Sequence, residues 1–384
     1  MLFVAAALLV VMGATALVLD RLWLDSAQAE LSTAAEAAAV AAAGRLADDH
    51  TLTDREIPEQ TLQQARQSAQ LAASSNLVAG RPVTLDTRPH HDVRFGRLVT
   101  NLETGRTRFL ETDSAPRSVV VTAHKNRRRN NPVALLFQRL VRRAAANVVA
   151  RAEASLDNHI VGLRPVGRVP VPALPIAIMR QSGANGTPGW QQQIVDGQGA
   201  DQYAFKSAAG QVLRQADGIP EIVLHSQPSG TASAQANFVL LGFNRGFRFR
   251  PLNRQIRSGL SATDLRTDGG QLTWDRRQVE LPGCVMVNHS LLAAFQSIIG
   301  QRRICLLYDS VETANHNGRC QTRCSELVAV RILSAVARTG NAIELVAQPT
   351  VITTRTAILL DEVAGHSASP VPANRYIYKL RLTH

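Results

Sequence analysis

The chain has 384 residues, which is long enough to bury a sizeable hydrophobic core in one to three domains. Its formal net charge is +12, and nearly all of the positive charge is arginine, because lysine occurs only at Lys125, Lys206 and Lys379. Such a surface permits anionic partners of several kinds. The aromatic content of 4% argues against nucleic acid, whose bases need aromatic side chains for stacking.

A continuous apolar run, Leu2–Leu19, opens the chain. As a helix with about 1.5 Å of rise per residue it is about 27 Å long, close to the ~30 Å hydrocarbon core of a bilayer. The run therefore predicts a retained transmembrane helix, a signal-anchor, with a cleaved signal peptide or a buried core helix as alternatives. Residues 50–384 are too polar to re-enter the bilayer. We expect them to be exported, to the periplasm or the cell exterior, from an inner-membrane anchor.

The helical pattern continues past Asp20 and Arg21 into an alanine-rich segment that ends near residues 46–49. One face of this extension carries small or apolar residues, and the other carries polar ones. The apolar face consists of Leu24, Ala27, Leu31, Ala34, Ala38, Ala41 and Ala42. Small side chains let a second helix approach closely, so this face predicts packing against other subunits, with docking on its own domain as the alternative. Asp20, at the edge of the bilayer, needs a basic partner, Arg21 or water.

Residues 50–164 predict a small α+β unit. A helix is expected over residues 59–76, a hairpin over 93–111 with its turn at Thr104–Gly105, and a strand over 117–125. Residues 131–144 show helical spacing after Pro132, and residues 147–156 alternate like a strand.

A proline-rich segment over residues 162–178 is the candidate domain boundary. Beyond it, strand-like runs recur, and a helix is expected over residues 290–299. The strand-like runs cover residues 221–226, 237–243, 304–311, 326–336, 342–352 and 376–382. The expected fold class is therefore α+β: a long helix (1–49), an α+β domain (50–164) and a β-rich C-terminal domain (165–384).

The four cysteines lie in the last third of the chain, at Cys284, Cys305, Cys320 and Cys324. In an oxidising compartment they can form two disulfides in three pairings, of which we favour Cys320–Cys324 with Cys284–Cys305. His316 precedes Cys320 by four residues, but the C-x-x-C pairs of a strong zinc site are absent. Zinc binding and free thiols remain alternatives.

No motif of an enzyme or of a cofactor site is present, and no residue is proposed as catalytic, cofactor-binding or metal-binding. The sharpest basic cluster is "HKNRRRN", residues 124–130. It lies between a strand and an expected helix, where a solvated loop is the default. Contact with an anionic surface or lipid head groups is one alternative, and nucleic acid is another.

The N-terminal segment resembles the opening of TadE/TadG-like proteins of the Flp (Tad) pilus assembly system. The resemblance rests on the apolar run, Asp20-Arg21 and "WLDSAQAELSTAAEAAAVAAAGRL". It continues in order through "DVRFGRL", "SVVVTAHK", "NPVALLFQRL" and "ANVVARAEASL", and so covers roughly residues 1–157. A weaker likeness to larger TadG-like proteins follows in "SGLSATDL", "LPGC" and "IIGQRRICLLYDSV". The prepilin cleavage motif and a D-x-S-x-S metal loop are missing.

The resemblance implies a non-enzymatic, membrane-anchored structural or accessory component, minor-pilin-like, of a Tad/Flp pilus or a related secretion apparatus in the cell envelope. Its partners would be the membrane and other subunits of the apparatus, reached through the N-terminal helix, with no cofactor and no nucleic acid. The main rival is a membrane-tethered β-rich protein that binds an anionic cell-envelope polymer. An exported hydrolase is a third possibility, but no residues support it.

Overall fold

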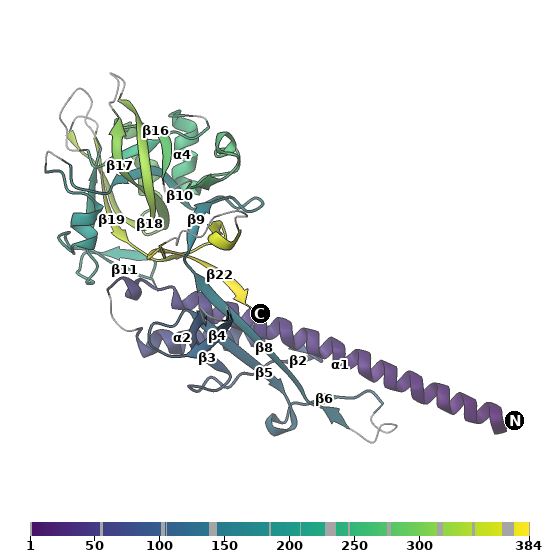
Figure 1. Cartoon of the computed structure of the whole chain (residues 1–384). Coiled ribbons are helices and arrows are strands. Elements are labelled where there is room, and N and C mark those ends of the chain that lie inside the picture. Colours follow the sequence, from purple (N-terminus) through teal and green to yellow (C-terminus); the bar gives the residue numbers. More distant parts are fainter. Residues whose placement is uncertain are drawn as a thin grey trace. The chain divides into compact units, whose positions relative to one another are not determined.

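The computed structural model describes most of the chain (Figure 1). The described residues are 2–53, 57–100, 104, 106–137, 144–183, 186–207, 209–226, 236–244, 246–274, 278–312, 318–339, 342–362 and 372–383. They form an α+β protein with a long N-terminal helix and a β-rich C-terminal region, as the sequence predicts in outline.

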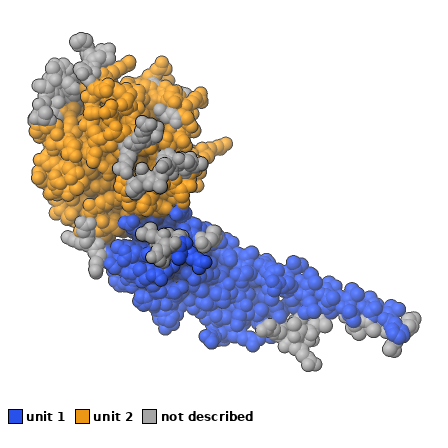
Figure 2. Space-filling model, viewed as in Figure 1, with its two compact units in different colours: residues 1–47, 56–156, 380–384 blue, residues 48–55, 157–379 orange. Residues whose placement is uncertain are grey.

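The chain divides into two compact units, coloured separately in Figure 2. Unit 1 comprises residues 1–47, 56–156 and 380–384, and unit 2 comprises residues 48–55 and 157–379. The division differs from the expected domains: residues 48–55 belong to unit 2, and residues 380–384 belong to unit 1. The N-terminal helix belongs to the α+β unit, and the boundary falls after residue 156, before the proline-rich segment.

Unit 1 is built around the helix α1 (Leu2–Leu46), which packs against α2 (Glu59–Ser74) and against the strand β5 (Ser118–Lys125). Alanine dominates the buried part of α1, and its short side chain lets both neighbours approach closely. The predicted end of the first helix and the predicted second helix are thereby confirmed.

The sheet of unit 1 has the strand order β22-β8-β5-β3-β4. The predicted hairpin is confirmed as β3 (Val93–Thr100) and β4 (Thr107–Glu111), which pair in antiparallel register from Gly96↔Glu111 to Thr100↔Thr107. The strand β8 (Val148–Asp157) pairs with β5 along its length, and β22 (Ile377–Thr383) brings the last residues of the chain beside β8. Side chains on one sheet face, such as Val121 and Ala152, are buried. A short hairpin of β1 (Leu77–Val78) and β2 (Arg81–Pro82) follows α2.

The helix expected over residues 131–144 is wrong for the residues that the structure describes. Val133–Ala134 form the strand β6, which pairs with β7 (Ala145–Ala146) as a hairpin, and residues 138–143 lie outside the described part. The physical reason is tertiary. The backbone N–H groups of Leu136 and Phe137 donate to the carboxylate of Asp20 on α1, a partner that local periodicity cannot reveal.

Unit 2 contains a closed five-stranded barrel. Its strands are β10 (Ala173–Met179), β14 (Phe238–Leu241), β16 (Val279–Cys284), β18 (Arg319–Ala337) and β17 (Arg302–Glu312). Each pairs with the next in that order, and β17 returns to pair in parallel with β10, which closes the ring. A barrel this small is filled by its own side chains. The barrel strands are covered on both faces, because Ile176, Ile178 and, on the opposite face, Leu306 are fully buried.

The remaining elements of unit 2 surround the barrel strands. The long strand β18 continues beyond the barrel to pair with β19 (Ile343–Pro349), which pairs with β13 (Ile222–His225). The other strands are β9 (Ile160–Leu163), β15 (Leu272–Thr273) and β21 (Ala357–Leu359) in one sheet, the pair β11 (Ala204–Lys206) and β12 (Gln211–Leu213), and β20 (Ile352–Thr353) beside the start of β22. The strand-like runs of the C-terminal half are thus confirmed as strands.

Two helices accompany the barrel. The sequence predicts one over residues 290–299, and the structure has a shorter α5 (Leu292–Gln296) preceded by a 3-10 turn, His289–Leu291. The other helix, α4 (Phe249–Ser258), was not among the expected elements. It packs Leu252 and Ile256 toward β10. Further short turns are Asp49–Thr53, Arg127–Arg129, Gln191–Val195, Arg266–Asp268 and Leu360–Glu362.

Candidate functional site

The first half of α1 exposes a continuous apolar surface. We call residues 3–22 the apolar section of α1. In the part of the chain that the structure describes, ten of its large apolar side chains are exposed: Phe3, Val4, Leu8, Val10, Val11, Met12, Leu17, Val18, Leu19 and Leu22. Phe3 is 91% exposed and Met12 is 64% exposed. Figure 2 shows unit 1 narrowing toward this end of the helix. Contiguous apolar patches on this scale mark interaction surfaces.

The membrane anchor expected from the same residues is wrong. Over the residues that the structure describes, no helix combines the length and the apolar character needed to cross a membrane. The localisation predicted from this anchor, an inner-membrane protein with an exported C-terminal part, is therefore not supported. The last turns of the apolar run are instead built into protein, since Ala16 is 3% exposed and Asp20 is 5% exposed.

The apolar section ends at a junction where α1 enters unit 1. One carboxylate oxygen of Asp20 accepts hydrogen bonds from Leu136 N (2.7 Å) and Phe137 N (3.2 Å). The Trp23 ring N–H, one turn later, donates to Ala134 O at 3.0 Å. These contacts hold the β6–β7 hairpin against the helix. The expected partners of Asp20 were Arg21, water or another subunit, but its partners are backbone amides of its own chain. Arg21 is exposed and pairs with Asp25 at 3.3 Å.

Beyond the junction, the alanine face of α1 is covered by its own unit. Ala27, Leu31, Ala34, Ala38 and Ala42 are at most 1% exposed, and Leu24 and Ala41 are half-buried. The helices and strands that cover this part of α1 are α2 and β5. The structure therefore shows that this face docks on its own domain, which was the alternative to packing against other subunits. The surface open to a partner is the apolar section.

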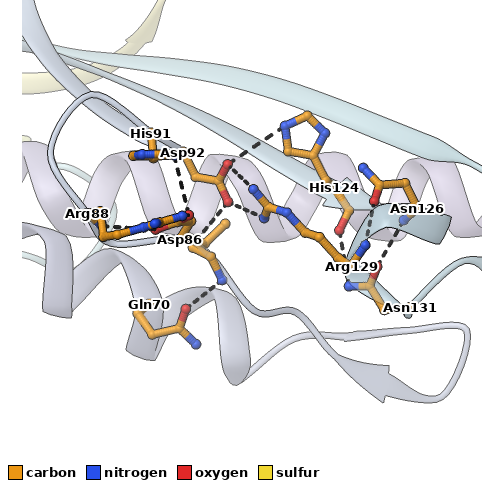
Figure 3. A network of polar contacts seen from close by, with 10 residues as sticks. Gln70, Asp86, Arg88, His91, Asp92, His124, Asn126, Arg129 and Asn131 are labelled. Carbon is orange, nitrogen blue, oxygen red and sulfur yellow. Dashed lines mark hydrogen bonds and ion pairs between the residues drawn. The ribbon is translucent and has the colours of Figure 1, made fainter.

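The basic cluster 124–130 is divided between buried and exposed side chains. Figure 3 shows the polar contacts of its residue Arg129 with Asp92. Arg129 forms a two-pronged ion pair with Asp92, which is 3% exposed, and this pairing raises the pKa of Arg129. Lys125 is buried, donates to Arg81 O and Pro82 O, and burial lowers its pKa. Arg127 and Arg128 are exposed on the turn between them.

The loop that carries Asp92 is held by further polar contacts in the same network. Asp86 N donates to Asp92 Oδ2 at 2.8 Å, and Leu85 N donates to Gln70 Oε1 at 2.6 Å. The side-chain hydrogen bonds from Arg88 hold the pKa of Asp86 well below its usual range. This network connects the loop to the turn and engages Arg129. Lys125 has separate contacts to Arg81 O and Pro82 O, so two basic residues of the cluster are engaged inside the chain.

None of the four cysteines is in a disulfide. Cys320 and Cys324 lie four residues apart on β18, about 13 Å along a strand and beyond the ~7 Å that a disulfide spans. Cys305 is opposite Val328 on the neighbouring strand, and Cys284 is opposite Arg319. Neither expected pair is formed. His316 lies outside the described residues, and among the described ones no group of three potential ligands could hold a metal ion.

The burial of the cysteines leads to a labelling prediction. Burial raises the pKa of all four thiols, that of Cys324 to about 12, and only Cys320 is partly exposed. A thiol reagent at neutral pH should therefore react with at most one cysteine per native chain, because the thiolate is the reactive form. In denaturant without reductant it should react with four. Two or fewer reactive thiols in denaturant would contradict the absence of disulfides.

The Asp20 junction also leads to a stability prediction. Asp20→Ala leaves the Leu136 and Phe137 amides without their acceptor and should lower the free energy of unfolding of unit 1 by about 2 kcal/mol. Asp20→Asn keeps the oxygen that accepts these hydrogen bonds. Its side-chain NH2 group replaces Oδ2, an atom that is buried with no hydrogen-bond partner. The free energy of unfolding should therefore fall less than about half as much in Asp20→Asn as in Asp20→Ala. Urea denaturation of both full-length variants measures the difference, and equal losses would show that these hydrogen bonds do not hold the junction.

No known protein family, no curated protein and no solved structure matches the chain. The functional assignment therefore depends on the geometry of the chain itself and on the resemblance of its N-terminal segment.

Proposed function

We propose that this chain is a structural or accessory subunit, minor-pilin-like, of a Tad/Flp-type pilus assembly or a related secretion apparatus. In this role the apolar section of α1 packs against the same section of neighbouring copies. The observation that carries the proposal is the contrast within one helix. Its second half is buried in its own unit, and its first half presents ten exposed large apolar side chains.

The composition of the apolar section supports helix-to-helix packing. Ala7 and Ala14 are exposed, lie two turns apart and so share one side of the helix. Nothing lies within 4 Å of the place that a side chain at Gly13 would occupy. Small residues between large apolar ones let two helices approach closely while the large side chains interlock.

Burial of the exposed side chains of the apolar section contributes free energy that favours assembly. Burial of an apolar side chain contributes about 1.5–3 kcal/mol. Ten side chains that are between 42% and 91% exposed therefore offer on the order of 10 kcal/mol. Association costs about 4–15 kcal/mol in lost freedom. The two magnitudes are comparable, so stable assembly requires most of the section to be covered, as in a bundle of several helices.

The experiment that tests the proposal is photo-crosslinking in the producing cells. A photoreactive amino acid at Leu17, in the apolar section, should capture a second copy or another subunit of the apparatus. The same group at Ala29, which is exposed on the packed half of α1, should not. If Leu17 captures nothing, or if both positions capture the same proteins, the apolar section is not an assembly surface.

A further inference from the structure

The outer face of the unit 1 sheet carries a basic groove that no residue of α1 lines. We call it the arginine groove. It has a volume of about 810 Å³ and is lined by Arg94, Leu98, Thr107, Arg108, Phe109, Arg151, Glu153, Arg381, Leu382 and Thr383. These residues come from β3, β4, β8 and β22, which are four strands of one sheet. All of them belong to unit 1.

The alternation of the strands explains why Arg94, Arg151 and Glu153 point to one face of the sheet. In β8, Ala150, Ala152 and Ala154 point into the core, so Arg151 and Glu153 point outward. The same alternation along β3 buries Val93 and Phe95 and turns Arg94 outward. Residues far apart in the sequence thus meet because the strands that carry them lie in one sheet.

The charge of the groove is strongly one-sided. Four arginines line it, and Glu153 is the single acid among the lining residues. The carboxylate of Glu153 lies 4.0 Å from Arg151 Nη2 and also accepts from Thr383 Oγ1 at 3.1 Å. Arg94 shares Glu111 with His90 at the rim. Arg151 is 58% exposed, so its guanidinium can meet a ligand.

The groove also has an apolar floor. Phe109 and Leu98 are half-buried partners across the β3–β4 pairing. The Phe109 ring lies over Gly96, where a Cβ atom would come within 2.6 Å of its Cζ atom. Glycine at this position lets the ring lie flat on the sheet, beside the arginines.

We propose that the arginine groove binds a segment of an acidic polysaccharide that carries carboxylates. The planar guanidinium fork matches a carboxylate with two parallel hydrogen bonds. The threonine hydroxyls suit sugar hydroxyls, and the Phe109 and Leu98 surface suits the apolar face of a sugar ring. Four strand spacings separate β22 from β4, about 19 Å, which favours a polymer over a single small anion. A single half-buried aromatic ring does not provide the stacking platform of a nucleic-acid site.

This proposal is independent of assembly through α1, and it places polymer binding in unit 1 instead of the β-rich C-terminal region. The probe is a fluorescein-labelled octagalacturonate, titrated with the full chain and followed by fluorescence anisotropy. Arg94→Gln with Arg151→Gln should weaken binding at least about tenfold, because two charge-assisted contacts are lost.

The matched control is Arg127→Gln with Arg128→Gln, which removes the same charge from exposed arginines outside the groove. It should change the affinity less than twofold. Equal weakening by both double variants would show unspecific charge attraction and overturn the proposal, as would no weakening by the groove variant. If the groove variant does not fold, Arg151→Glu decides on its own, since that side chain is more than half exposed. An unchanged affinity in Arg151→Glu would overturn the site.

Competing ligands test the class of polymer. A neutral galactose octamer should not bind. Polyphosphate and polyglutamate of matched charge should bind more weakly than the octagalacturonate. If either of these binds more tightly, or if the neutral octamer binds equally well, the polysaccharide assignment is wrong.

Discussion

Replacing Val11 and Val18 by Gln should weaken self-association of the chain at least about 100-fold. The two side chains lie two helical turns apart on one side of α1 and are 61% and 58% exposed. If neighbouring copies cover them, each loss costs about 1.5–3 kcal/mol of association free energy, and together the two correspond to that factor. Sedimentation velocity over a range of concentrations measures the change.

The fold should not change in this double variant, because both side chains are exposed in the isolated chain. The melting temperature of dilute protein should therefore stay within error of the parent. The matched control is Leu71→Gln on α2, where an equally exposed leucine (68%) lies outside the apolar section. It should leave the association unchanged. The assembly proposal fails if the double variant sediments like the parent, or if Leu71→Gln has the same effect.

Asp49→Ala should produce the largest loss of stability in unit 2, about 3 kcal/mol. Asp49 follows the end of α1 by three residues, and its carboxylate pairs with Arg331 Nη2 at 2.8 Å. It also accepts from Thr350 Oγ1 and Val351 N, both at 2.7 Å. The Arg331 side chain is only 3% exposed, and its guanidinium lies 3.8 Å from the centre of the Phe205 ring. Burial lowers the pKa of Arg331, and the nearby Asp49 opposes that effect.

The physical reason is that the substitution leaves a buried cation without its counter-charge, which typically costs about 3–5 kcal/mol. We expect the lower end of this energy range because the Asp49 side chain is itself 22% exposed. Asp49→Asn keeps an acceptor for Val351 N and should lose less. Arg302→Gln removes a longer (3.6 Å) and more exposed contact to Asp49, and it should cost less than about 1 kcal/mol. Urea denaturation compares the three, and a loss in Asp49→Ala no larger than in Arg302→Gln would contradict this account.

Several elements could be predicted because their signals are local. The alanine-rich helix ends where its periodicity ends, at Leu46, and the strand alternation of β8 is visible in "ARAEASL". The β3–β4 hairpin has strand-forming runs on either side of a turn signal. In each case the residues that decide the structure are neighbours in the sequence.

The failures have a common cause in long-range contacts. Residues 132–137 have helical spacing, but the amides of Leu136 and Phe137 find their acceptor on Asp20, 116 residues earlier for Leu136. The cysteine pairing was judged from spacing, while the strand geometry separates Cys320 from Cys324. The alanine face of α1 was expected to meet other subunits because nothing in the sequence shows that α2 and β5 cover it.

The candidate surfaces were only partly visible in the sequence. The apolar run was obvious, but among the described residues it does not form the membrane-spanning helix that was expected. The arginine groove could not be found, because Arg94, Arg151 and Arg381 meet only once the order of the strands is known. The run 124–130 has the highest local density of basic residues in the sequence, but its Lys125 and Arg129 make contacts inside the chain.

Hydrogen–deuterium exchange of α1, measured by mass spectrometry at low and high protein concentration, shows whether copies of the chain assemble through the apolar section. The amides of residues 27–46 should be protected at every concentration, because α2 and β5 cover that half of the helix in a single chain. The amides of residues 3–19 should exchange readily in dilute protein and become protected as copies assemble. Protection of residues 3–19 that does not depend on concentration, or its absence from the assembled protein, would contradict assembly through the apolar section of α1.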